Sequence, residues 1–256
     1  MSRSVGIVVP AYRPNPERLA SYLRALDDEF AGARLHVELD DPDERTVEVL
    51  SESPATVSVT PYRRGKGAAI TAGFERLDAD VDVLAFADAD GSTPPSSFAA
   101  VVGAAVDGRA DLAAGSRRHP DSTVESHQTF ARRRLGDGFA WLARRLLDAD
   151  LYDYQCGAKA ISADAWDRVR EHLYAPGFAW DIELVAMAAA MNRDVEEVPI
   201  TWQDQPGSTV SPVRTSLRMA RALFTARHRA KRVRDSQLHT AIAARREQPK
   251  ALVERE

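Results

Sequence analysis

One pair of carboxylates is placed where it could hold a metal ion. Asp88 and Asp90 follow the apolar run 83–87 and precede Gly91. Two carboxylates at the end of a strand can share Mg²⁺ or Mn²⁺, which takes its other ligands from water and a substrate diphosphate. The ion would neutralise the charge that builds on a departing nucleoside diphosphate. The alternative interpretation is a pair of turn acids ahead of a helix.

A lysine lies in a glycine-rich turn, in the segment Gly65-Lys66-Gly67. Open backbone N–H groups and one ammonium group suit a phosphate. The segment is not a Walker A sequence, because position 60 is not glycine and no Ser or Thr follows the lysine. A plain glycine turn is the other interpretation.

Further acidic residues are candidates for binding or proton transfer. Asp40 and Asp41 could accept hydrogen bonds from a nucleobase or a ribose, or they could form a solvated acidic turn. Asp181 and Glu183 follow Trp180 at the start of an apolar helix. One of these two could be a general base or could orient the site. Asp181 could instead cap the helix.

Arginines could bind a second phosphate. Arg117 follows a predicted strand, and Arg132 lies on the next predicted helix within the triplet 132–134. Guanidinium groups bind phosphate through charge-assisted hydrogen bonds. For most of the triplet a solvated helix face is the simpler interpretation.

Alternating strands and helices must position these residues. The alternation predicts βαβ units and a mainly parallel sheet, in which ligands bind at the carboxyl ends of the strands. The candidate residues fall after five such strands. The predicted strands are 5–9, 35–39, 56–60, 81–87, 112–114 and 195–201. The predicted helices are 16–29, 46–51, 68–77, 94–106, 130–147, 162–173, 182–191 and 211–234.

Composition and charge narrow the class of protein. Of 256 residues, 44% are hydrophobic and 28% charged, which is typical of a globular chain. The single cysteine, Cys156, excludes an internal disulfide and favours a reducing compartment. No leader peptide or apolar run of about 20 residues is visible, so we expect a cytoplasmic protein attached peripherally to the membrane.

The net charge of −4 conceals a basic C-terminal part. Residues 205–256 carry 12 basic and 4 acidic residues, hence +8. On the predicted helix, arginines recur along one stripe beside an apolar stripe. We therefore expect residues 213–234 to contact an anionic membrane surface. A helix packed on the domain is the alternative, and nucleic acid is not expected, because aromatic residues do not alternate with the arginines.

In order, these motifs resemble family 2 glycosyltransferases of the GT-A fold, in the group of dolichyl-phosphate glucosyltransferases and dolichol-phosphate mannose synthases. The resemblance runs from about Val5 to Ser211. It implies a glycosyltransferase domain over 1–211, followed by a basic helical tail over 212–256. It rests on the segments Val8–Tyr12, Gly65–Ala69, Asp88–Gly91, Gly115–Arg117, Asp153–Lys159, Trp180–Leu184 and Glu197–Trp202.

The resemblance implies a role for each matching residue. Asp88 and Asp90 would bind the metal, and Arg117 and Arg132 the acceptor phosphate. Asp90, Asp181, Arg117 and Arg132 form the implied catalytic set. The implied donor-binding residues are Pro10, Ala11, Tyr12, Asp40, Lys66, Asp88, Gln155 and Glu183.

The resemblance also implies an activity. We expect an inverting transfer of glucose or mannose from UDP-glucose or GDP-mannose to a polyprenyl (dolichol-type) phosphate, with Mg²⁺ or Mn²⁺. Arg13 and Pro42 depart from the family pattern near the nucleoside. Three alternatives therefore stay open: a soluble or polysaccharide acceptor, nucleotidyl transfer, and nucleotide-sugar binding without catalysis.

Overall fold

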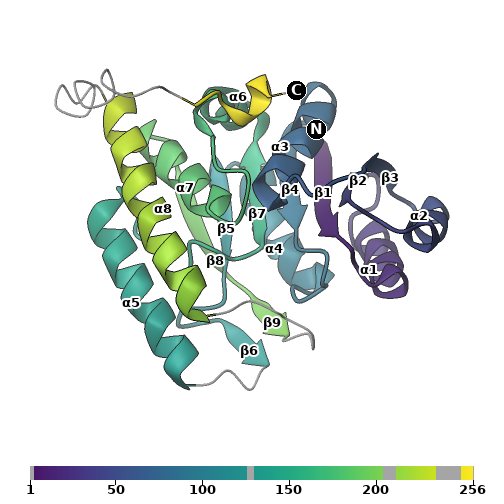
Figure 1. Cartoon of the computed structure of the whole chain (residues 1–256), viewed down its shortest axis with the longest axis horizontal. Coiled ribbons are helices and arrows are strands. Elements are labelled where there is room, and N and C mark those ends of the chain that lie inside the picture. Colours follow the sequence, from purple (N-terminus) through teal and green to yellow (C-terminus); the bar gives the residue numbers. More distant parts are fainter. Residues whose placement is uncertain (1–2, 126–129, 204–211, 235–248, 256) are drawn as a thin grey trace.

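The computed structural model describes residues 3–125, 130–203, 212–234 and 249–255 (Figure 1). A central sheet of seven strands has the order β3-β2-β1-β4-β7-β5-β8. Only β7 runs antiparallel within it, between β4 and β5. The strands are β1 (Val5–Tyr12), β2 (Arg34–Asp40), β3 (Thr56–Thr60), β4 (Val83–Ala87), β5 (Leu112–Ser116), β7 (Ala158–Ser162) and β8 (Val195–Pro199).

Helices cover both faces of the sheet (Figure 1). The buried core on one face includes side chains of α1 and α4, and the core on the other includes those of α3, α6, α7 and α8. The helices are α1 (Pro16–Glu29), α2 (Glu44–Ser51), α3 (Lys66–Leu77), α4 (Pro95–Val106), α5 (Phe130–Leu146), α6 (Ala163–Val169), α7 (Trp180–Ala190) and α8 (Pro212–Val233). Short 3₁₀ turns lie at Asp78–Asp80, Arg170–His172 and Leu252–Glu254.

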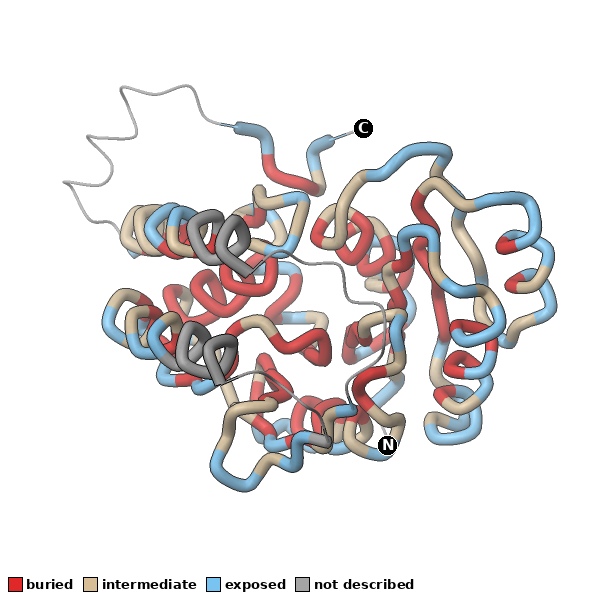
Figure 2. The backbone as a smooth tube through the Cα atoms, turned by 60° about the horizontal axis from the view of Figure 1, so that its bottom comes forward, coloured by how far each residue is buried: buried red, intermediate tan, exposed pale blue. Residues whose placement is uncertain are grey.

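Helix α7 is buried along its whole length. Every residue from Trp180 to Ala190 is buried, and Figure 2 colours the buried residues red. Helix α8 lies over it and buries Leu223, Ala226 and Ala230, while Phe224 remains 56% exposed. One face of the basic helix thus packs on the domain, and the other faces outward.

The α/β prediction is confirmed, with local differences. The predicted strand 195–201 is divided into β8 and β9 (Thr201–Gln203), because Pro199 has no N–H for a ladder bond and the chain then joins a second sheet. There β9 pairs with β6 (Thr123–Glu125), a strand that the sequence did not predict. The predicted helix 162–173 consists of α6 followed by a 3₁₀ turn.

Local signals explain where the helices begin. Asn15 caps α1, because its side chain accepts a hydrogen bond from the backbone N–H of Arg18, and Pro16 follows at the first helical position. Asp43 caps α2 in the same way through the N–H of Thr46 (2.7 Å). This residue follows Pro42, one of the departures from the family pattern, and it supplies a capping side chain there.

Candidate active site

Several of the candidate residues lie at the carboxyl ends of the parallel strands. Tyr12 and Asp40 end β1 and β2 and are register partners. Asp88 follows β4, and Arg117 follows β5. Lys66 begins α3, directly after the turn that follows β3. The order of the strands therefore brings residues that are far apart in the sequence to one edge of the sheet.

Four alternating charges form the centre of this site. Lys66 Nζ lies 2.9 Å from Asp88 Oδ1 and 3.2 Å from Asp181 Oδ2. Lys159, on β7, donates from Nζ to Asp181 Oδ1 (2.9 Å) and to the backbone oxygen of Cys156 (2.7 Å). Both ammonium groups lie over the ring of Phe86, at 5.1 and 5.7 Å from its centre. Lys66 therefore links the candidate metal ligand Asp88 to Asp181.

This arrangement disfavours Asp181 as a general base. Burial raises the pKa of Asp181, but Lys159 and Lys66 outweigh that effect, so the pKa lies below its ordinary value. Its two oxygens are each held by an ammonium group, and the side chain is only 2% exposed. A carboxylate with a low pKa and both oxygens engaged is a poor proton acceptor. The geometry instead makes Asp181 an orienting residue for the two lysines.

Asp88 has the opposite electrostatic environment. Desolvation raises its pKa, and Asp90 and Asp181 raise it further, whereas Lys66 lowers it. The net shift is upward, although 41% of the side chain is exposed. An added cation beside Asp88 would relieve the repulsion among these carboxylates.

The residues around Asp88 fit a divalent ion. A Cβ at Gly157 would lie 1.8 Å from Asp88 Oδ2, so only glycine leaves room for this carboxylate. Asp90 is exposed on the following turn, where its Oδ1 accepts the N–H of Ser92 (2.9 Å). Within the described part of the chain, His, Cys, Asp and Glu form no cluster of three or more suited to a metal. Mg²⁺ is commonly bound by two carboxylates, with its other ligands supplied by water and by the substrate.

Arg117 is oriented by a buried partner. Its Nε and one terminal nitrogen donate to the two oxygens of Asp153 (2.7 and 3.1 Å). Burial raises the pKa of Asp153, but Arg117 lowers it more, so this carboxyl remains ionised. The guanidinium has five N–H donors, and these two bonds leave others for an anion. The predicted phosphate-binding role of Arg117 is compatible with this geometry.

The predicted nucleoside-binding acid Asp40 is already well bonded. Its Oδ2 accepts the N–H groups of Arg64 (2.7 Å) and Gly65 (3.1 Å), and its Oδ1 accepts from Arg64 Nε (2.7 Å). The same guanidinium pairs with Glu38, which is fully buried on β2. Asp40 thus holds the glycine-rich turn in place, and its contacts are with that turn.

The remaining predicted residues have varied placements. Ala11 is buried in β1, whereas Tyr12 is 41% exposed beneath Arg63, 4.3 Å from its ring centre. Gln155 lies near α8, since its Nε2 is 2.8 Å from the sulfur of Met219. Pro10 is half-buried in β1. Arg132 lies on α5, and its side chain is outside the described residues.

Glu183 belongs to a different group from Asp181. Residues two apart on a helix point to nearly opposite faces. Glu183 accepts the N–H groups of Tyr174 (2.7 Å) and Ala175 (2.8 Å) and pairs with Arg229 of α8. The donor-binding prediction for Glu183 is therefore not matched by its contacts, which hold a loop and not the Asp88 centre.

Sequence reasoning missed several residues of this site. The sequence placed Lys159 and Asp153 in a motif but assigned them no role, and it did not single out Glu38. One signal was available for Lys159: the chain has only four lysines among 34 basic residues, and two of them lie in the buried centre. An isolated lysine in an apolar strand indicates a buried partner carboxylate.

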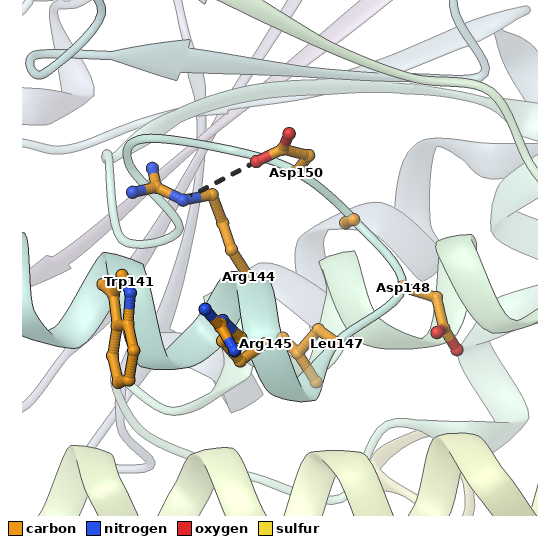
Figure 3. Close-up of a pocket in the computed structure, with 7 residues that line it drawn as sticks. Trp141, Arg144, Arg145, Leu147, Asp148 and Asp150 are labelled. Atoms are coloured by element: carbon orange, nitrogen blue, oxygen red, sulfur yellow. Dashed lines mark ion pairs between the residues drawn. The ribbon is translucent and has the colours of Figure 1, made fainter.

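A separate surface hollow of about 430 Å³ lies at the end of α5 (Figure 3). Arg145 lies over the ring of Trp141, 5.1 Å from its centre, and Arg144 pairs with Asp150 at 3.6 Å. The segment 147–150 completes its wall. The hollow is formed by α5 and this segment, not by the strand ends that carry Asp88.

A mostly parallel sheet covered by helices on both faces, with this charged site at its strand ends, defines an α/β protein of the kind that binds ligands at that edge. The model of "Glycosyl transferase family 2" matches residues 6–165. The chain belongs to this glycosyltransferase family.

Relatives of known name agree with that assignment. The chain is 29% identical over 243 residues to a dolichyl-phosphate beta-glucosyltransferase of Drosophila melanogaster, covering 87% of this chain and 74% of the relative. It is 30% identical to the glycosyltransferase AglD of Haloferax volcanii over 84% of this chain and 35% of the relative. It spans about half (52%) of the human dolichyl-phosphate beta-glucosyltransferase, at 28% identity over 65% of this chain.

Solved structures confirm the fold. The glucosyl-3-phosphoglycerate synthase of Mycobacterium tuberculosis, determined with Mn²⁺, UDP and glucosyl-3-phosphoglycerate, superposes with a TM-score of 0.65 at 17% identity. The match covers 88% of this chain and 80% of that one. None of the helices in the described ranges combines the length and the apolar character that crossing a bilayer requires.

Proposed function

We propose that this glycosyltransferase moves glucose from UDP-glucose to a dolichol-type polyprenyl phosphate, with inversion at the anomeric carbon. The observation that carries the proposal is the strand-end centre of Asp88, Lys66 and Asp181, in which Asp181 is engaged by two lysines. Relatives named dolichyl-phosphate beta-glucosyltransferase support both the sugar and the lipid acceptor. GDP-mannose is the competing donor.

The chemistry of the acceptor fits a site in which the described carboxylate proposed as a base, Asp181, is already engaged by two lysines. A phosphate monoester has a second pKa of about 6, so it arrives ionised and can attack the anomeric carbon directly. Arg117, oriented by Asp153, would hold that phosphate by charge-assisted hydrogen bonds. Catalysis then consists mainly of positioning and of stabilising charge.

Asp88 and Asp90 would hold Mg²⁺ or Mn²⁺, which supplies charge neutralisation for the leaving UDP. The structure of the mycobacterial synthase with Mn²⁺ and UDP supports this choice of cofactor. The ammonium group of Lys66, 2.9 Å from Asp88, would lie beside the same diphosphate.

The outward face of α8 supports a peripheral location at a membrane. Phe224 is 56% exposed there, and Arg221 is exposed one turn before it. An aromatic side chain flanked by arginine suits an anionic interface, where each basic residue contributes about 1 kcal/mol. We place this contact on the cytoplasmic side, where nucleotide sugars and a reduced Cys156 are expected.

The direct test is transfer of labelled sugar. Purified protein would receive Mn²⁺ or Mg²⁺, polyprenyl phosphate, and either UDP-glucose or GDP-mannose, and label would be counted in the lipid extract. Metal-dependent labelling from UDP-glucose alone is the expected result. Labelling from GDP-mannose would correct the donor. UDP release with only a soluble acceptor would refute the lipid proposal.

Asp90→Ala tests the metal assignment. The variant should lose turnover by at least about 100-fold, because the leaving diphosphate loses an electrostatic partner. Asp107→Ala is the matched control, since Asp107 is an exposed acid at the end of α4. Circular dichroism would verify the fold of both. Full activity of a folded Asp90→Ala protein would remove Asp90 from the metal site.

A further inference from the structure

The loop between Leu173 and α7 lies directly against the glycine-rich turn that carries Lys66. The N–H of Ala68 donates to the oxygen of Pro176 (3.0 Å). A Cβ on Gly67 would lie 2.5 Å from the oxygen of Ala175, and one on Gly65 would lie 2.6 Å from that of Pro176. With no space between them, a shift of this loop must move the turn or leave it unsupported.

The side chain of Glu183 holds the same loop through hydrogen bonds to its backbone. Its Oε2 accepts the N–H groups of Tyr174 and Ala175, at 2.7 and 2.8 Å. The side chain is only 2% exposed, so these bonds and its charge are shielded from water. A buried carboxylate of this kind needs a cation to remain stable.

Arg229 of α8 supplies that cation. It pairs with Glu183 Oε1, and its guanidinium lies over the ring of Tyr174 at 4.4 Å. A cavity of about 190 Å³ separates the rest of α8 from the loop, lined largely by small residues. At this place packing between helix and loop is incomplete, so the ion pair and the ring contact make the connection.

We propose that Arg229 is a positioning residue for the donor site, acting from α8 through Glu183 and the loop 174–176 on the turn 65–68. The inference rests on the proposed function only in placing the nucleotide diphosphate beside Lys66. The free energy of packing α8 on the domain and the free energy of binding the nucleotide are then coupled, and the coupling is reciprocal. A helix outside the sheet thereby contributes to affinity for the donor.

The first test measures binding, not transfer. The dissociation constant for UDP with MnCl₂ would be determined by calorimetry for the full chain and for Arg229→Met. We expect the variant to bind UDP about tenfold more weakly. In kinetics, KM for UDP-glucose should rise by a similar factor while kcat changes less. Arg229→Lys, which keeps the charge, should restore part of the affinity.

The matched control is Arg221→Met, which removes the same charge from an exposed position on the same helix. It should bind UDP as the unaltered protein does. Equal weakening in both variants would indicate a general charge effect and overturn the proposal. So would an Arg229→Met protein with unchanged UDP affinity, or an unaltered protein that binds no nucleotide.

Hydrogen exchange tests the physical link without nucleotide. In Arg229→Met the amides of Tyr174, Ala175 and Ala68 should exchange faster, while those in the middle of α7 should not. Unchanged exchange at Ala68 would refute the connection. Glu183→Gln keeps an oxygen acceptor and loses the charge, so it serves if Arg229→Met does not fold. Because these readouts involve no lipid, their failure is distinguishable from failure of the proposed transfer.

Discussion

Replacing Lys159 by Met should strongly destabilise the protein. Lys159 is 1% exposed and pairs with Asp181, which is equally buried. Breaking a buried pair by removing one partner costs about 3–5 kcal/mol. Asp181 retains Lys66, which favours the lower end, but the oxygen of Cys156 also loses its donor, at about 1 kcal/mol. We therefore expect a loss of about 4 kcal/mol.

Urea unfolding followed by circular dichroism measures this loss as a change in the free energy of unfolding. Lys231→Met is the control, because Lys231 also pairs with an aspartate, Asp148 at 3.3 Å, but on the surface. Surface pairs contribute at most about 1 kcal/mol. If Lys159→Met costs no more than Lys231→Met, the buried network does not stabilise the fold and the reasoning fails.

Two more predictions follow from single contacts. Gly157→Ala should displace the carboxylate of Asp88 and lower kcat/KM by at least about 100-fold. Gly103→Ala is the control, because a Cβ there meets nothing within 4 Å, and its kinetics should be unchanged. Equal kinetics for the two variants would refute the steric argument. Burial raises the pKa of Glu38, but His36 and Arg64 lower it more, so the net shift is downward. The ionised Glu38 contributes its full stabilising free energy above the pKa of the unfolded state, about 4.3. That contribution is lost as the pH falls through the lower pKa of Glu38 in the folded protein. Glu38→Gln should therefore flatten the decline of stability in acid denaturation below about pH 4, and an unaltered slope would contradict it.

The order of elements and the edge of the sheet that carries the site could be predicted from the sequence. Apolar runs such as 83–87 end in polar turns, and in a parallel sheet these ends must meet. Asp88, Lys66 and Arg117 accordingly fall together. The start of α1 was predicted at Asn15 or Pro16 and rests on a local contact, because the side chain of Asn15 accepts from the N–H of Arg18; α2 was predicted from residue 46 but begins at Glu44. Local rules were sufficient for the strand ends and for the start of α1.

The partners of the charged residues were not local, and there the sequence was insufficient. Asp181 and Lys159 are 22 residues apart, and Glu183 and Arg229 are 46 apart. The acids Asp181 and Glu183 stand at i and i+2, a spacing that suggests one shared role. On a helix, however, residues two apart point to nearly opposite faces. The antiparallel insertion of β7 brings Lys159 beside β4. That strand order depends on the whole topology and on no local pattern.

The pairing of the acids bears on which acceptor the site can use. A neutral hydroxyl acceptor needs a carboxylate that can take a proton. The buried acids of the described site, Asp40, Asp153 and Asp181, are instead engaged by cations or backbone N–H groups, and releasing one would leave a buried charge without a partner. The more exposed Asp88 and Asp90 are the acids proposed to hold the metal. An acceptor that is already an anion needs no such release, because it brings its own nucleophilic charge and requires only a cation to hold it.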